Sequence, residues 1–308
     1  MATDRYADLP NFKRNKTPIK KTVGQIIYIV VGVILSLIFL FPILYMLATS
    51  TKSESAYAAS LTNGGLALFI PDFANLGGAL KNYGNVFTEF GIWKYALNSF
   101  LYAGIVIVLN VLVNGLAGYV MAKLRFPGKR FLSFMIIFLI VVPVETSIIP
   151  LYSIVMIMLG LKGTMTVLGV ILPSAISIFN IFLFMQFFSN IPAEYEEAAR
   201  MDGANTLQVF FKVILPLSKP IVATVAVFCF IGVWNDYLWP SMILPAPSEG
   251  QWSLYPIQTV ISSMENMSEL TTGERMAALI VTSTPIFIIY VLAQKYIVQG
   301  FGTAGLKM

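Results

Sequence analysis

The longest polar passage of this chain covers residues 194–220 and reads EYEEAARMDGANTLQVFFKVILPLSKP. Its acidic side chains come first and its basic ones follow, so it is suited to ion pairing, within the chain or with a partner protein. The chain has no histidine, and its one cysteine, Cys229, lies in an apolar run. A disulfide framework, a cysteine metal site and a histidine-based site are therefore excluded. With its acids scattered, the chain also lacks clustered catalytic groups, so we expect a non-catalytic protein without a cofactor or metal of its own.

Composition indicates which kind of structure carries this passage. Of the 308 residues, 57% are hydrophobic and 11% are charged, and the mean hydropathy is +0.78. Soluble domains carry about a quarter of charged residues. The sequence therefore predicts an all-α integral membrane protein. The net charge of +5 suits a membrane surface. A nucleic-acid partner is not expected, because that would require basic residues clustered on a folded face.

The number of membrane spans follows from the charge-poor stretches. Crossing a bilayer takes about 20 apolar residues. Six stretches are long enough: 22–51, 95–122, 131–161, 163–193, 220–248 and 276–294. The first is too long for a cleavable signal peptide, and a polar arm precedes it. Prolines delete a helix hydrogen bond and bend the helix, so we expect interruptions at Pro42, Pro143, Pro150, Pro173 and Pro285.

The orientation of the six predicted helices follows from the basic residues. With both termini in the cytoplasm, fifteen of the twenty Lys and Arg residues lie on the inner side, as the positive-inside rule favours. This arrangement gives a cytoplasmic arm (1–21), a membrane domain (22–298) with a cytoplasmic hairpin (190–217), and a cytoplasmic tail (299–308). The outer segment 51–96 is expected to pack as short helices or loops.

Local signals predict that the polar passage folds as two short helices. Asn190 is a candidate N-cap of the first helix, and Glu196 and Arg200 are spaced to pair on one of its faces. Gly203 supplies a left-handed turn, and Asn205 or Thr206 can cap a second helix that Pro216 would end. Its apolar residues suggest burial against the bundle or a partner: Phe210, Phe211, Val213 and Ile214. An amphipathic hairpin lying on lipid headgroups is the alternative.

The order of residues in the hairpin resembles a known pattern. Glu197-Ala198-Ala199, Asp202-Gly203-Ala204, Phe210, Ile214-Leu215-Pro216 and Pro220 are similar to the "EAA" loop of ATP-binding-cassette (ABC) importer permeases. The likeness continues along nearly the whole chain from the first span, and it is closest to the smaller six-helix partner of the maltose-type carbohydrate permeases. It is carried by Asn82-Tyr83, Asn98-Ser99, Tyr119, Arg125-Phe126-Pro127-Gly128, Pro150-Leu151-Tyr152, Gly160-Leu161, the run from Trp234 to Pro240, and Gln294-Lys295-Tyr296. The arm and residues 53–80 match nothing in that family.

The resemblance implies a fold, partners and a location. A type I ABC importer permease fold would sit in a bacterial cytoplasmic membrane beside a second permease subunit. Two copies of a cytoplasmic ATPase would drive transport, and an extracytoplasmic binding protein would deliver a carbohydrate. This chain has no phosphate-cradling G-x-x-x-x-G-K-[ST] loop, so ATP and magnesium would bind to the ATPase chains.

The resemblance also gives roles to the hairpin residues. Glu197 would pair with a basic residue of the ATPase, Ala198 and Ala199 would allow close approach, and Gly203 would make the turn. The same coupling pattern includes Asp202, Ala204 and Pro216. Residues 299–307 resemble a segment that reaches between the ATPase subunits, and a frayed terminus is the alternative.

The transport path is the second candidate site. Glu145 and Asp236 are costly at membrane depth, which makes them functional candidates, although either can instead lie near a helix end in water. Trp234, Tyr237 and Trp239 can stack on sugar rings, with Asn235 and Asp236 bonding to hydroxyls, or such aromatic residues can form an interfacial belt. Polar residues within the spans are expected to hold helices together: Asn110, Asn114 and Asn180.

The family transports di- and oligosaccharides, polyols and glycerol phosphates. We expect a neutral oligosaccharide here, because no basic cluster in the spans suggests an anion site. A secondary transporter or channel without an ATPase is the alternative function. It would call for an internal repeat, a filter or a charge relay, and the sequence shows none of these signatures.

Overall fold

The computed structural model describes the backbone of residues 23–246, 253–264 and 270–305, and this part of the chain is helical, without a strand. The all-α prediction is therefore confirmed for these residues. The predicted arm, residues 1–21, lies outside them. The chain divides into two units, Met1–Tyr45 and Met46–Met308.

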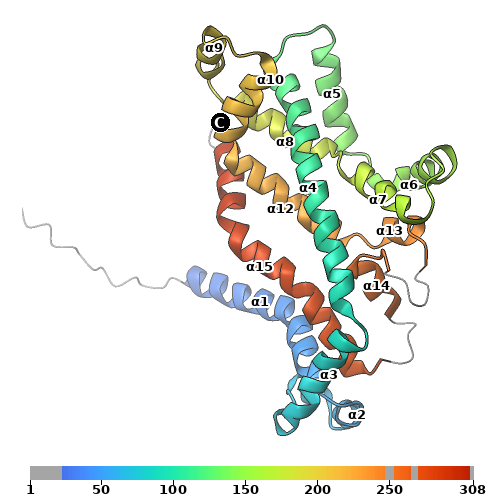
Figure 1. The fold of residues 1–308 in the computed structure, drawn as a ribbon. Coiled ribbons are helices and arrows are strands. Elements are labelled where there is room, and N and C mark those ends of the chain that lie inside the picture. Colours follow the sequence, from blue (N-terminus) through green and yellow to red (C-terminus); the bar gives the residue numbers. More distant parts are fainter. Residues whose placement is uncertain (1–22, 247–252, 265–269, 306–308) are drawn as a thin grey trace, which may run out of the picture. The chain divides into compact units, whose positions relative to one another are not determined.

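The helices follow one another along the chain, as Figure 1 shows. The α-helices are α1 (Val23–Ser50), α2 (Glu54–Thr62), α3 (Leu76–Thr88), α4 (Ile92–Lys123), α5 (Lys129–Ile140), α6 (Ile148–Tyr152), α7 (Thr166–Ser174), α8 (Ile178–Ser189), α9 (Glu194–Met201), α10 (Thr206–Val209), α11 (Leu215–Leu217), α12 (Lys219–Asn235), α13 (Leu238–Ile243), α14 (Ile257–Ser263) and α15 (Thr272–Gly305). Short 3₁₀ turns cover Gly65–Phe69, Phe73–Asn75, Val144–Ser147 and Gly163–Met165, and π-helical turns cover Ser153–Met158 and Phe210–Ile214.

The first unit contains most of α1. Its residues from Gln25 to Phe41 are exposed within the structure and almost all apolar, as lipid-facing residues are. The helix continues past Pro42, so the interruption predicted there does not end it, and α15 likewise continues past Pro285. An apolar run folds as a helix here because every backbone donor and acceptor must be paired within a membrane.

Long helices and bent pairs supply between three and six candidate membrane spans in the described residues. By length and composition, Gln25–Ser50, Ile92–Lys123 and Thr272–Gln294 can each cross a membrane as one helix. The other three candidates in the described residues are pairs bent at a short break, and their bends are 101° (Lys129–Ile140 with Val144–Met158), 42° (Gly163–Ser174 with Ile178–Ser189) and 83° (Thr206–Leu217 with Lys219–Asn235). The largest bend lies beside Pro143, one of the predicted interruptions.

Three of the predicted spans therefore differ from single helices, and the span 163–193 divides into α7 and α8. Residues 131–161 turn sharply after α5, because Pro143 cannot continue the helix. Residues 220–248 contain α12, which ends at Asn235, followed by the separate helix α13. At the C-terminus, α15 continues to Gly305, so most of the predicted tail 299–308 has a helical backbone.

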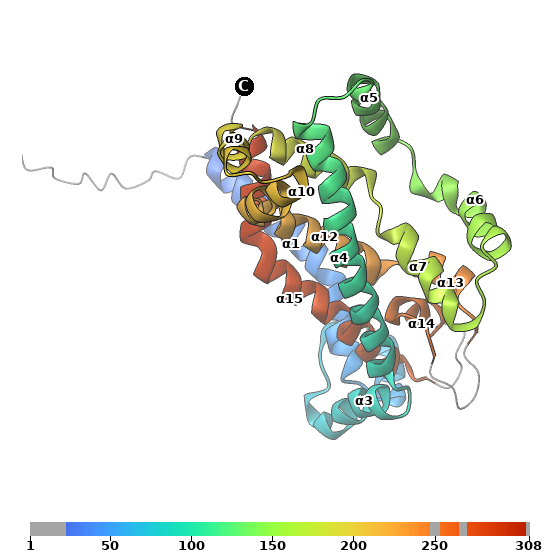
Figure 2. The same ribbon diagram turned by 45° about the horizontal axis from the view of Figure 1, so that its top comes forward.

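The core of the second unit forms where α4 packs against α8 and α12, and where α12 packs against α15 (Figures 1 and 2). Asn114 Nδ2 donates to the carbonyl of Ala175, and Asn180 Nδ2 donates to Asn110 Oδ1, both at 3.0 Å. These bonds join α4 to α8 and to the end of α7, so the prediction that the three asparagines hold helices together is confirmed.

The segment 51–96, predicted to lie on the outer side, folds as short helices, as predicted, and it is fastened to the start of α15. Asn82 on α3 donates to the carbonyls of Ser50 and Lys52, each at 2.9 Å. The buried Lys52 Nζ donates to Ser60 Oγ at 2.9 Å. A Cβ at Gly273 would lie 2.4 Å from the Lys52 carbonyl oxygen, so only glycine allows this approach. Figure 2 shows this region and α9 at opposite ends of α4.

Candidate functional site

The hairpin has the predicted two-helix form with a glycine at the bend. Gly203 adopts a left-handed φ of +83° after α9. Its N–H donates to the Arg200 carbonyl, and the N–H of Ala204 donates to the Ala199 carbonyl, both at 3.0 Å. This is a Schellman motif, in which the left-handed residue satisfies the last carbonyls of the helix.

The second hairpin helix begins at a capping box and continues beyond its predicted end. Asn205 caps α10 through a capping box, in which Asn205 Oδ1 accepts from the N–H of Gln208 and Gln208 Oε1 accepts from the N–H of Asn205, each at 2.9 Å. Of the two candidate caps, Asn205 is thus the one used. The helix does not end before Pro216. It continues through a π turn into α11, where Pro216 occupies the first turn and its missing N–H needs no partner.

The start of the first hairpin helix also differs from the prediction. Asn190 does not cap α9, because it ends α8, and its Nδ2 donates back to the Gln186 carbonyl at 3.0 Å. The residue before α9 is Ala193, which has no capping side chain. Glutamates in the first turn of α9 complement the positive end of its dipole instead.

One side of the hairpin is built into the helix bundle. Val209, Phe210 and Ile214 are fully buried, in one apolar cluster with Tyr119 of α4 and Phe184 of α8. Ala199 and Ala204 pack against the same cluster. This burial supports packing on the bundle over the alternative of a hairpin lying on lipid headgroups.

The other side of the hairpin is open. Glu197, Ala198, Asp202 and Gly203 are all exposed, and so is Pro216. The predicted coupling residues therefore divide into an exposed set and the two inward-facing alanines, Ala199 and Ala204. Two exposed apolar residues, Met201 (87%) and Leu207 (59%), flank the turn and were missed by the sequence analysis. Their signal was a large apolar side chain beside the bend of a polar hairpin.

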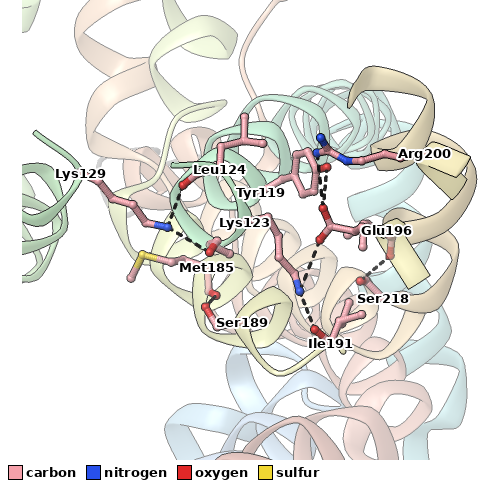
Figure 3. A network of polar contacts seen from close by, with 12 residues as sticks. Tyr119, Lys123, Leu124, Lys129, Met185, Ser189, Ile191, Glu196, Arg200 and Ser218 are labelled. Atoms are coloured by element: carbon pink, nitrogen blue, oxygen red, sulfur yellow. Dashed lines mark hydrogen bonds and ion pairs between the residues drawn. The ribbon is translucent and has the colours of Figure 1, made fainter. Parts of the chain in front are cut away.

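Glu196 is tied to α4 by a cluster of polar contacts, which Figure 3 shows from close by. Its Oε1 lies 3.4 Å from Lys123 Nζ, and its Oε2 accepts from the Tyr119 hydroxyl at 3.3 Å. Arg200 lies 3.9 Å from Oε2, so the predicted Glu196–Arg200 pair is present. Lys123 also donates to the carbonyl of Ile191, in the link between α8 and α9. The sequence analysis named Tyr119 only for the family resemblance and did not predict that Tyr119 or Lys123 contacts Glu196, because no spacing rule relates residues so far apart in the chain.

The second candidate site forms a pocket of about 360 Å³. Its lining brings together Glu145, Asp236 and Trp239, three of the predicted path residues, and the described residues of this lining include no lysine or arginine. Glu145 lies in the 3₁₀ turn Val144–Ser147, and Asp236 follows the last residue of α12, so both lie at breaks between helices. Asp236 Oδ1 accepts from the N–H of Trp239 at 3.3 Å.

The other predicted path residues lie in different surroundings. Trp234 is fully buried, its Nε1 donates to the Thr282 carbonyl at 3.1 Å, and its ring packs against Phe230. The expectation that Trp234 stacks on a sugar is therefore not supported, because its ring belongs to the core. Asn235 and Tyr237 are exposed beside Asp236. Trp239 is 7% exposed, and its Nε1 donates to the Gly169 carbonyl at 3.0 Å.

Comparisons with known proteins agree with this arrangement. Residues 114–303 match the family described as "Binding-protein-dependent transport system inner membrane component". The chain is 29% identical over 275 residues to the arabinooligosaccharides transport system permease protein AraQ of Halalkalibacterium halodurans, covering 89% of this chain and 93% of that protein. It is 30% identical to the diacetylchitobiose uptake system permease protein NgcG of Streptomyces coelicolor, covering 85% and 82%. It is 35% identical to the sn-glycerol-3-phosphate transport system permease protein UgpE of Pectobacterium atrosepticum, covering 72% and 76%.

A solved structure shows the same fold. It is the crystal structure of a bacterial ABC transporter involved in the import of the acidic polysaccharide alginate, one chain of which superposes with a TM-score of 0.70 at 27% identity. The match covers 90% of this chain and 97% of that one. These findings do not favour a secondary transporter or channel. The chain is a multi-pass membrane protein of the binding-protein-dependent transport system inner membrane component family, and thus a permease subunit of an ABC importer.

Proposed function

We propose that this chain forms one half of the translocation path of an ATP-driven sugar importer in a bacterial cytoplasmic membrane. A second permease subunit supplies the other half, two copies of a cytoplasmic ATPase bind ATP and magnesium, and an extracytoplasmic binding protein delivers the sugar. The observation that carries the proposal is the hairpin 190–217, which is rooted in the bundle through Phe210 and presents Glu197, Ala198 and Asp202 to a partner.

The proposed topology has six crossings with both termini in the cytoplasm. Three long helices, two bent pairs and α12 supply the candidate spans, while Thr206–Leu217, the first half of the third bent pair, belongs to the hairpin. This arrangement places the hairpin on the cytoplasmic side, together with fifteen of the twenty basic residues. Docking of the hairpin on the ATPase converts closure of the ATPase pair into a rigid-body movement of the permease.

We propose that the pocket beside Glu145 and Asp236 borders the sugar path. The relatives are named for arabinooligosaccharides, diacetylchitobiose and sn-glycerol-3-phosphate, and the solved structure for acidic alginate, so the family alone does not fix the charge of the substrate. Two carboxylates, without a basic residue in the lining, repel anions and accept hydrogen bonds from sugar hydroxyls. A neutral oligosaccharide is therefore the substrate class that fits.

Uptake into liposomes tests this function. With the second permease, the ATPase and the binding protein present, ATP should drive import of a neutral oligosaccharide. Replacing both acids, Glu145→Gln with Asp236→Asn, should lower the import rate about tenfold, because a hydrogen bond to a charged group contributes about 1.5 kcal/mol. The ATPase should still copurify, since the hairpin is untouched.

Glu89→Gln is the matched control, because Glu89 is an exposed acid that follows α3, outside the pocket lining. It should import at the wild-type rate. ATP-independent import by the wild-type complex would contradict the importer, and wild-type import by the double variant would place the pocket outside the path.

A further inference from the structure

The way α9 is held to the bundle is unusual for a short surface helix. Such a helix normally buries an apolar stripe. In the fully described helix α9, Glu196 is instead the one buried residue, with 10% of its side chain exposed. Its carboxylate needs cationic or hydrogen-bonding partners at this site, because an unpaired buried charge is costly.

The partners of Glu196 come from the last turns of α4. Lys123 Nζ, whose side chain is 11% exposed, lies 3.4 Å from one carboxylate oxygen, and the Tyr119 hydroxyl donates to the other at 3.3 Å. The same end of α4 is held from a second direction, since Lys129 Nζ donates to the carbonyls of Ala122 and Leu124 (Figure 3). A displacement of α9 along the membrane normal would therefore pull on the end of α4.

The N-terminal half of α4 contacts residues 253–255, which precede α14 in the chain. Asn98 Nδ2 donates to the carbonyls of Ser253 and Tyr255, at 2.7 and 3.0 Å, and the Tyr102 hydroxyl donates to Leu254 at 2.7 Å. Tyr102 also shares an apolar cluster with Trp239, which lines the pocket. As one helix of 32 residues, α4 spans about 48 Å at 1.5 Å per residue.

We propose that Glu196 is the positioning residue that transmits movement of the coupling hairpin to α4, through a clamp formed by Glu196, Lys123 and Tyr119. The proposal rests on the proposed function, in which the hairpin docks on the ATPase. Glu196 itself faces inward and leaves docking to its exposed neighbours, Glu197 and Ala198. Glu197 thus contacts the ATPase, and the adjacent Glu196 transmits the movement of the hairpin to α4.

The test uses the full complex in liposomes, with sugar import, ATP hydrolysis and ATPase copurification measured together. Glu196→Gln and Lys123→Met should each lower the sugar imported per ATP hydrolysed about tenfold, while the ATPase still copurifies. The double variant should be no worse than either single one, because both changes break the same contact. Glu194→Gln, an exposed acid on the same helix, is the control and should keep wild-type coupling.

A purely structural role would give a different pattern. In the double variant no buried charge is left without its partner, because both charges are removed. The double variant should therefore regain the thermal stability that the single variants lose. If the clamp transmits movement, import per ATP stays low even though stability returns. If a single variant fails to assemble, the double variant and Tyr119→Phe distinguish a structural role from transmission of movement. Tyr119→Phe keeps both charges, and it should also lower the sugar imported per ATP.

Two outcomes would overturn the clamp: wild-type import per ATP in Glu196→Gln, or recovery of coupling together with stability in the double variant. Failure of the proposed function is distinguishable, because the wild-type complex itself would then fail to retain the ATPase.

Discussion

Replacement of Gly203 by proline is expected to abolish ATP-driven import, with a loss of about a hundredfold or more. Gly203 has a φ of +83°, whereas proline fixes φ near −65°, and a proline that is incompatible with its backbone costs about 3 kcal/mol or more. Proline also removes the N–H that donates to the Arg200 carbonyl. The turn must then open, and the exposed face of the hairpin loses the shape that the ATPase binds. Import and copurification of the ATPase should fall together.

Gly203→Asn is the matched control for this prediction. Asparagine adopts the left-handed region more readily than other non-glycine residues, and a Cβ at this position meets no atom within 4 Å. Import should therefore fall at most a few-fold. Equal loss in both variants would show that the side chain, and not the backbone turn, is what the partner rejects. Normal import in Gly203→Pro would remove the hairpin from the coupling mechanism.

Replacement of Gly118 by leucine should destabilise the folded permease, because α4 packs tightly against α8 at this residue. A Cβ there would lie 2.5 Å from Phe184 Cβ, 3.0 Å from the Met185 nitrogen and 3.2 Å from the Ile181 oxygen. Two of these atoms are backbone, so the helices must separate, and overpacking of this kind costs about 1–3 kcal/mol or more. Separation would also strain the Asn180–Asn110 bond. In detergent, the yield of monodisperse protein should fall about tenfold.

Gly104→Leu in the same helix provides the comparison. Gly104 is exposed, and a Cβ there has no neighbour within 4 Å. Its yield and melting temperature should match those of the wild type. Similar yields for the Gly118 and Gly104 variants would contradict the close packing of α4 on α8.

Much of the hairpin was predictable because its signals are local. A glycine after an amphipathic turn predicts a left-handed bend, and an asparagine two residues later is a candidate N-cap of the next helix. The prediction that Asn190 caps α9 was wrong, because an asparagine can end one helix as readily as start the next. The prediction that Pro216 ends the second hairpin helix was also wrong. A π turn precedes the proline, and the helix continues as α11 with Pro216 in its first turn.

Contacts between distant residues were not predictable in the same way. The clamp joins residues 77 positions apart, and the pocket joins a break near Glu145 to one at Asp236. Pro143 lies at one break and Pro173 near the end of α7 at another, whereas α1 and α15 continue past Pro42 and Pro285. Nothing local sets the angle of 101° at the first break and 42° at the second. Likewise, Trp234 and Trp239 look equivalent in the sequence. Only packing shows that the ring of Trp234 is enclosed against Phe230, whereas Trp239 borders the pocket.

The central claim, that the hairpin docks on a cytoplasmic ATPase, is tested most directly by site-directed crosslinking. Cys229, the one cysteine of the chain, is buried and can be removed as Cys229→Ala, so an introduced thiol is unique. With a thiol–amine crosslinker in active complexes, Ala198→Cys should crosslink to the ATPase, and Thr62→Cys, at the exposed end of α2, should not. Absence of an ATPase crosslink at residue 198 in complexes that still import sugar, or its presence at residue 62, would contradict the account.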